Sequence, residues 1–365
     1  MQDLVAEWGE TTVSLAGGLA LGAFFGWVSQ RSRFCLRAAA IDFWGGGLSH
    51  RVAVWAIAFA AAVAMTQIAA HTQWLAISDV RQLNQRGSLS GAIIGGAMFG
   101  VGMILTRGCA SRLLVLSANG NLRALLAGLI FAVAAQATSR GALLPLRDRL
   151  AGLWTLEGYD HLSALALLGL PGWTALGLAA AFIAIAAFIT LHVKLPWRYI
   201  LGAVGVGLAV AATWTFTSRM AAASFDPQPV KSLSFTGPSA NMLMLVLQQG
   251  AKWDFDVGLV PGVFLGSFLA AAYGRELKLE GFHDGQSMRR YILGAVLMGF
   301  GGMLAAGCAI GAGVSGAAVF STVSWATLFA MWIAAGVTDA LVDRVKAAPA
   351  GAVLSPSPPS PSRAA

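Results

Sequence analysis

Long apolar segments recur along this chain, and they confine it to one class of fold. Nine of them are expected to cross a membrane: 13–30, 50–70, 88–106, 121–140, 172–193, 198–217, 256–273, 289–306 and 323–343. Apolar and polar residues do not alternate within these segments, so the pattern predicts helices rather than strands. Only 11% of the residues are charged, whereas soluble domains carry about 25%. The sequence therefore predicts an all-α integral membrane protein with about nine transmembrane helices.

Several of these segments are shorter than the roughly 20 residues that a straight crossing needs, most clearly beside the cysteines. Broken helices survive at membrane depth only inside protein or along a wet cavity, so short re-entrant helices are expected. Residues 141–155 are expected to form an interfacial amphipathic helix, and 218–255 a long loop with a short helix near 239–249. The Pro/Ser-rich tail at 346–365 is expected to be disordered.

Two stretches of the chain carry the same small residues 199 positions apart. Six of them match in register: Gly95, Gly100, Gly102, Gly108, Cys109 and Ala110 correspond to Gly294, Gly299, Gly301, Gly307, Cys308 and Ala309. Such a match indicates an internal duplication, although abundant glycine leaves chance as the alternative. Five expected spans separate equivalent points, and this odd number predicts inverted repeats with the substrate between them. We expect a first repeat at 1–171, a connecting span at 172–193 and a second repeat at 194–345.

The basic residues indicate how the chain is oriented. If the N-terminus lies outside, sixteen Lys and Arg residues fall inside and eight outside. The positive-inside rule therefore favours an outside N-terminus and a cytoplasmic C-terminus. Much of the net charge of +8 is then loop charge rather than a nucleic-acid surface, and no nucleic-acid partner is expected. Asp3, Glu7 and Glu10 occupy the N-terminus without a basic region, which argues against a signal peptide.

The three cysteines occupy the same kind of position. Cys35, Cys109 and Cys308 each open a short apolar stretch that ends in glycine. If these stretches are half-helices, each thiol lies at a helix N-terminus, where free N–H groups and the helix dipole attract anions. The alternative is that each cysteine is a small buried hydrophobic residue, but three like positions favour the first interpretation. The cysteines show neither a CxxC pair nor metal-site spacing with histidine, and no metal or cofactor is expected.

Arginines flank two of the cysteines. Arg31, Arg33 and Arg37 lie near Cys35, and Arg107 and Arg112 lie near Cys109. Charges near the membrane interior are costly and often functional. Arg33 and Arg107 are the candidates for drawing in an anion, with interfacial snorkelling as the alternative. Gly108 and Gly307, which directly precede two of the cysteines, complete the candidate path.

The cysteine motifs also carry a resemblance. They are Gln30-Arg31-Ser32-Arg33-Phe34-Cys35, Gly108-Cys109 and Gly307-Cys308-Ala309-Ile310-Gly311. In these motifs, and over about residues 13–343, the chain resembles the YeeE/YedE family of sulfur-transport membrane proteins. The resemblance implies an inverted-repeat fold, thiosulfate import at the bacterial inner membrane, and three cysteines that pass the anion along by weak S–H hydrogen bonds. It also implies a small TusA-like sulfur carrier protein as a cytoplasmic partner.

Uptake of a small sulfur oxyanion, with thiosulfate as the first choice, is therefore the expected function, with the lipid bilayer as surroundings. Transport of another sulfur or selenium compound stays open, because Cys109 is followed by Ala-Ser-Arg and lacks the GCxxG pattern of Cys308. A membrane thiol-dependent sulfurtransferase is the alternative from another class. It lacks an evident general base, since no histidine neighbours a cysteine. A third hypothesis is a scaffold that recruits a soluble sulfur carrier.

Overall fold

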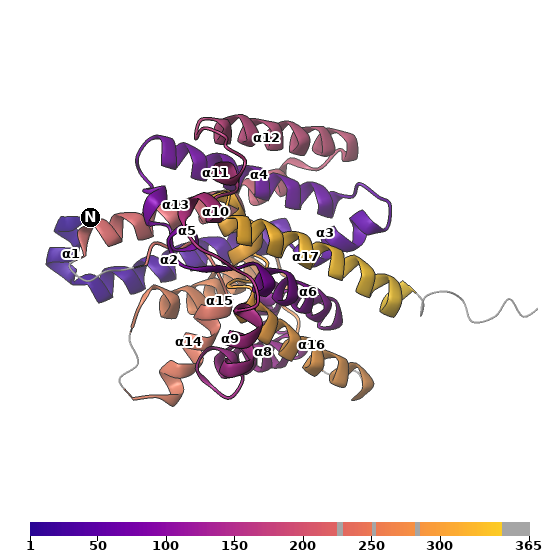
Figure 1. Cartoon of the computed structure of the whole chain (residues 1–365). Coiled ribbons are helices and arrows are strands. Elements are labelled where there is room, and N and C mark those ends of the chain that lie inside the picture. The colour runs from indigo at the N-terminus through magenta and orange to yellow at the C-terminus, as the bar shows by residue number, and fades with distance from the viewer. Residues whose placement is uncertain (225–228, 250–252, 282–284, 345–365) are drawn as a thin grey trace, which may run out of the picture.

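A computed structural model describes residues 1–224, 229–249, 253–281 and 285–344, which form a bundle of long helices that share one general direction (Figure 1). The long helices are α2 (Glu10–Ser32), α4 (His50–His71), α6 (Leu89–Leu105), α8 (Leu122–Arg140), α12 (Thr174–Val193), α13 (Trp197–Ala223), α15 (Phe255–Tyr273), α16 (Gly285–Leu304) and α17 (Thr322–Asp339). In the described part of the chain, the only sheet is the short antiparallel pair β1 (Gly87–Ser88) and β2 (Thr155–Leu156).

Short helices fill the breaks between the long ones. Four of them come after a long helix along the chain: α3 (Leu36–Trp44), α7 (Ala110–Ala118), α14 (Thr236–Leu247) and the π-helix η2 (Gly311–Gly316). The others are α1 (Gln2–Trp8), η1 (Ile77–Asp79), α5 (Arg81–Asn84), α9 (Leu144–Ala151), α10 (Tyr159–Leu162), α11 (Ala164–Leu167) and the π-helix η3 (Ala340–Arg344).

Within the described residues, eight stretches are long and apolar enough to cross a membrane. They match eight of the nine expected spans and confirm an all-α multi-pass membrane protein. The ninth expected span, 289–306, corresponds to α16, which is long enough to cross a membrane but is less apolar than the other eight stretches. Arg289 and Arg290 near its start lower its mean hydropathy.

The expected secondary features differ in detail. The expected interfacial helix at 141–155 is the shorter α9, which has proline in its first turn and no buried residue. Proline there suits a helix start, because the first N–H groups of a helix lack internal partners. The short helix expected at 239–249 is α14, which begins three residues earlier. The expected tail at 346–365 lies outside the described residues.

Glycines let α6 and α16 approach backbone to backbone. A Cβ atom on Gly95 would lie 2.5 Å from the carbonyl oxygen of Gly301, and one on Gly102 would lie 2.5 Å from that of Gly294. Residue numbers rise along α6 as they fall along α16, so the two helices are antiparallel. Gly95 and Gly102 correspond to Gly294 and Gly301 at the spacing of 199. Gly95 therefore faces the counterpart of Gly102, and Gly102 faces the counterpart of Gly95. This reciprocal pattern is that of an isologous contact, in which a two-fold axis relates α6 and α16.

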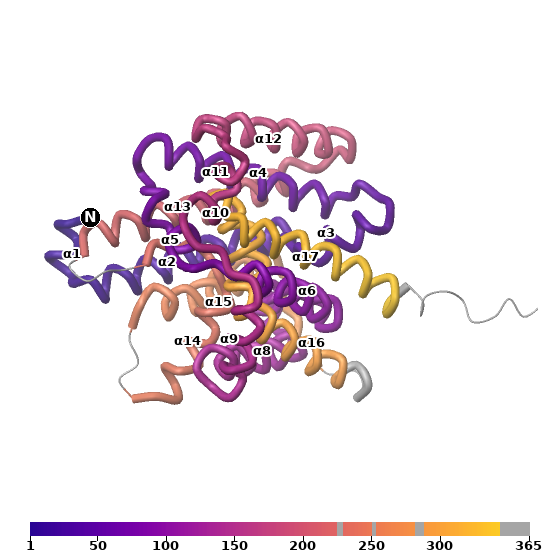
Figure 2. The backbone as a smooth tube through the Cα atoms, in the orientation of Figure 1, coloured from indigo at the N-terminus to yellow at the C-terminus, as the bar shows by residue number. Residues whose placement is uncertain are grey.

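Other packed pairs follow the same correspondence (Figure 2). α2 packs on α15 as α13 packs on α4, and α6 packs on α17 as α16 packs on α8. α2 and α13 are themselves antiparallel, because Gly202 faces Ser32 and Gly205 faces Val28. α12 packs against α4 at one edge of the bundle.

Candidate functional site

Each cysteine lies at a break between two helices that has the same backbone form. The residue two positions before each cysteine has a left-handed backbone conformation: Arg33 (φ 55°), Arg107 (φ 58°) and Ala306 (φ 56°). Non-glycine residues are uncommon in this region of the backbone map, so three at matching positions mark a repeated break. Cys35 and Cys109 are the N-cap residues of α3 and α7. The expectation of a half-helix behind these two cysteines is confirmed.

The break at Cys308 ends in a π-helix rather than an α-helix. Cys109 precedes Asn121, the N-cap of α8, by 12 positions, whereas Cys308 precedes Ser321, the N-cap of α17, by 13. The π-helix η2 lies within the longer interval. Its wider turns absorb one extra residue without lengthening the segment. The backbone therefore follows a similar course from the cysteine to the next long helix in both halves of the chain.

Steric crowding favours glycine before two of the cysteines, and it is severe at Gly307 and mild at Gly108. A Cβ atom on Gly307 would lie 2.7 Å from the backbone nitrogen of Ala312. A Cβ atom on Gly108 would lie 3.3 Å from the side chain of Leu113. Both glycines thus let the chain fold back on the first turn of the helix that follows. This supports a role in shaping the break.

The breaks bring two of the thiols together. The thiols of Cys35 and Cys109 lie close enough to interact, and Sγ of Cys109 lies 3.4 Å from Oγ of Ser111. Cys109 is buried, whereas Cys35 is partly exposed. All three cysteines of the chain are free thiols. They are therefore available as hydrogen-bond donors.

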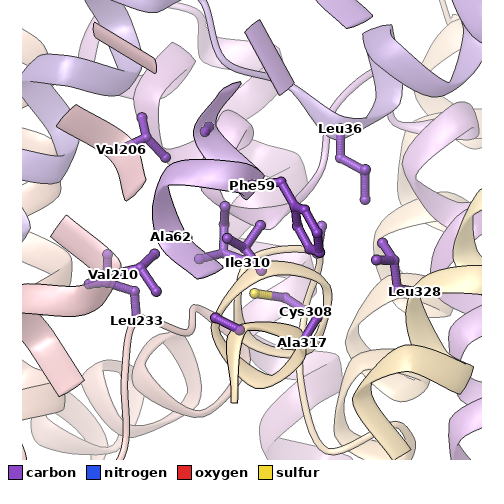
Figure 3. Packing of buried hydrophobic residues seen from close by; sticks show 14 of the residues in the cluster. Leu36, Phe59, Ala62, Val206, Val210, Leu233, Cys308, Ile310, Ala317 and Leu328 are labelled. Atoms are coloured by element: carbon purple, nitrogen blue, oxygen red, sulfur yellow. The ribbon is translucent and has the colours of Figure 1, made fainter. Parts of the chain in front are cut away.

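Cys308 has a different set of partners. Its Sγ accepts hydrogen bonds from the backbone N–H of Phe235 at 3.3 Å and of Gly311 at 3.4 Å. Oγ of Ser234 lies 4.0 Å away. Figure 3 shows the thiol inside a coil of the chain, near Ile310. Cys308 is only 1% exposed, so its thiol lies in the interior of the bundle and not at its surface.

The arginines that flank the cysteines fall into two groups. Arg33 and Arg107 are exposed, and Arg33 pairs with Glu276 at 3.5 Å. Arg37 and Arg112 lie close enough to the Cys35 thiol to act on it electrostatically. Among the described residues, Nε of Arg37 and Nη1 of Arg112 are buried without a hydrogen-bond partner. An unsatisfied buried donor is costly, so these two guanidinium groups suit an anion better than Arg33 and Arg107 do.

A sequence signal for this second group existed. Arg37 and Arg112 follow their cysteines by two and three positions, which places them in the first turn of α3 and α7. Arg33 and Arg107 stand before the cysteines, in the turns that end α2 and α6. Helix position, rather than closeness in sequence, separates the arginines beside the thiols from those at the surface.

Asp343 connects this region to η3. Nη1 of Arg290 donates to its carboxylate at 2.7 Å, and Nη2 of Arg37 lies 3.9 Å away. Nη2 of Arg290 also donates to the carbonyl oxygen of Ile104, near the end of α6. The network joins α3, α6, α16 and η3, and so braces the break that contains Cys109.

Comparison with known proteins identifies the family. Residues 31–337 match the model of a family described as sulphur transport. The chain belongs to this sulphur transport family. The family is one of transport proteins rather than enzymes, and the match confirms the resemblance to YeeE/YedE proteins seen in the cysteine motifs.

Two relatives extend this comparison. The thiosulfate transporter TsuA of Escherichia coli is 27% identical over 348 residues, which cover 87% of this chain and 91% of that protein. The thiosulfate transporter TsuA of Spirochaeta thermophila is 29% identical over 328 residues, which cover 84% of this chain and 93% of that protein. The similarity therefore extends over nearly the whole length of both relatives.

Proposed function

We propose that this protein imports thiosulfate across the bacterial inner membrane. The observation that carries the proposal is the closeness of Cys35 and Cys109 beside two partly buried arginines, each with a buried nitrogen that has no hydrogen-bond partner among the described residues. Guanidinium groups make strong, charge-assisted hydrogen bonds to an oxyanion, and a thiol adds a weak donor. Arg37 and Arg112 attract the dianion, and the thiols bind it weakly enough to let it leave. The relatives named as thiosulfate transporters support the choice of substrate.

The path we propose lies between two inverted repeats, at 1–171 and 194–345, joined by the span at 172–193. Counterpart helices that lie in contact and run antiparallel support this division, as α6 and α16 do. Substrates of transporters with inverted repeats bind between the halves. The cysteine at each break then serves as one position along the path. Cys35, Cys109 and Cys308 hand the anion on without a covalent intermediate.

The surroundings of the path complete the proposal. The N-terminus lies outside and the C-terminus is cytoplasmic, as the distribution of basic residues favours. Arg33 and Arg107 lie at a mouth of the path and raise the local concentration of anions. Gly108 and Gly307 shape the breaks. A small TusA-like sulfur carrier receives the sulfur anion on the cytoplasmic side.

Uptake of radiolabelled thiosulfate tests the function directly. The protein is expressed in cells that lack other importers of sulfate and thiosulfate, with the empty vector as the control. We expect label to accumulate and the cells to grow with thiosulfate as the sole sulfur source. A protein that reaches the membrane in normal amount yet gives no uptake above the control would overturn the proposal.

Arg112→Gln should lower uptake about tenfold or more, because it removes a charged donor beside the Cys35–Cys109 pair. A hydrogen bond to a charged group contributes about 1.5–3 kcal/mol, and 1.4 kcal/mol corresponds to a factor of ten. The measurement is the initial uptake rate at matched protein level. Arg123→Gln is the control, since Arg123 stacks over the ring of Tyr291. Equal rates for both variants and the wild type would remove Arg112 from the path.

A further inference from the structure

The correspondence at a spacing of 199 positions extends beyond the glycine stretch. In it, Ser234 of the second half corresponds to Cys35 of the first half. The flanking residues correspond as well, since Phe34 and Leu36 are 2% and 1% exposed, and their counterparts Leu233 and Phe235 are 0% and 1% exposed. Cys35 and Ser234 are both half-buried between them. Cys35 directly precedes α3, and Ser234 lies just before α14. Sequence position, burial and the following helix therefore agree.

The neighbour of Ser234 corresponds to the neighbour of Cys35. Cys35 contacts Cys109, whose counterpart is Cys308, and Oγ of Ser234 lies 4.0 Å from Sγ of Cys308. The short helices pack in matching ways, because α3 contacts α4 and α17 while α14 contacts α15 and α8. One difference is that the chain reaches Ser234 through a loop rather than a left-handed helix end. The correspondence thus holds for the residue pair and for the helix behind it.

The two pairs differ in charge. At the spacing of 199, Arg37 corresponds to Thr236 and Arg112 to Gly311. Oγ1 of Thr236 is buried without a hydrogen-bond partner among the described residues, and the residue is 2% exposed. The N–H of Gly311 donates to Cys308. At these corresponding positions the Cys308 side carries neutral donors, namely hydroxyl, thiol and backbone N–H groups.

We propose that Ser234 is a fourth residue of the anion path and forms with Cys308 a neutral counterpart of the Cys35–Cys109 pair. This inference rests on the proposed function. Charge-assisted hydrogen bonds are roughly twice as strong as neutral ones. The cationic pair therefore holds the anion more strongly, and the neutral pair holds it more weakly. The hydroxyl of Ser234 takes the place that a fourth thiol would have in a fully symmetric path.

Substitution of Ser234 tests its part in transport. We expect Ser234→Ala to lower the uptake of labelled thiosulfate about fivefold or more at matched protein level, and Ser234→Cys to retain most of it. Ser267→Ala is the matched control, because Ser267 is fully buried in α15 and its Oγ also lacks a partner among the described residues. Uptake by Ser234→Ala equal to that of Ser267→Ala and the wild type would overturn the inference while the proposed function stands.

Chemical labelling gives a readout that does not depend on transport. The anionic reagent 2-sulfonatoethyl methanethiosulfonate is added to Ser234→Cys and to Ser267→Cys in intact membranes, and mass spectrometry measures modification of each introduced thiol. We expect modification at 234, slowed by thiosulfate, and none at 267. No modification at 234 would overturn the inference even if the wild type imports thiosulfate. Modification at 234 in a protein that imports no thiosulfate would overturn the proposed function and keep Ser234 on an anion path.

Discussion

Cys109→Ala and Cys308→Ala should each abolish growth on thiosulfate while the protein stays folded in the membrane. Both thiols are free and buried at helix breaks, and each contacts a second polar group of the site. Replacing one buried thiol by a methyl group costs about 1 kcal/mol, within the range of ordinary substitutions. Folded proteins have a margin of about 5–15 kcal/mol. Loss of uptake at normal protein level would therefore come from the path and not from misfolding.

The serine variants make this prediction sharper. Cys→Ser keeps a donor but replaces a weak S–H by a hydroxyl that forms stronger hydrogen bonds. If weak contacts let the anion move on, Ser at 109 or 308 is nearly as damaging as Ala. Growth rate and initial uptake are the measurements, with membrane protein level as the control. Normal growth of both Ala variants would show that these cysteines are only small buried residues.

Gly95→Val should remove most of the folded protein from the membrane. A Cβ atom at this position would lie 2.5 Å from the carbonyl oxygen of Gly301, and the backbone of α16 cannot rotate away as a side chain can. Extra methylene groups in a packed core cost about 1–3 kcal/mol even where side chains can move. Here α6 and α16 must separate along the contact that joins the two halves. The measurement is the monodisperse fraction after detergent extraction.

Gly128→Val is the matched control for that prediction. Gly128 lies in α8, and a Cβ atom there meets nothing within 4 Å. Both changes add the same three carbon atoms to a glycine inside a membrane helix. We expect the Gly128 variant to extract like the wild type. Equal behaviour of the two variants would contradict a backbone contact between α6 and α16.

Hydropathy and the internal repeat were enough to predict much of this architecture. A stretch such as 172–193 is apolar along its whole length, and that property alone decides that it crosses the bilayer. The breaks were also visible, because the apolar runs beside Cys109 and Cys308 are short and rich in glycine. The span at 289–306 was predicted from its apolar run despite Arg289 and Arg290, and it corresponds to α16.

The sequence by itself thus determined the fold class, the helix breaks and the three cysteines at those breaks. Only the tertiary structure decided which residues meet there: Cys35 with Cys109, Arg37 and Arg112 beside them, and Ser234 with Cys308. The reason is physical. Whether a segment is helical and apolar depends on its own residues, whereas the partners of a side chain depend on how distant helices pack. Arg33 and Arg37 are four positions apart, yet one lies at the surface and the other beside a thiol.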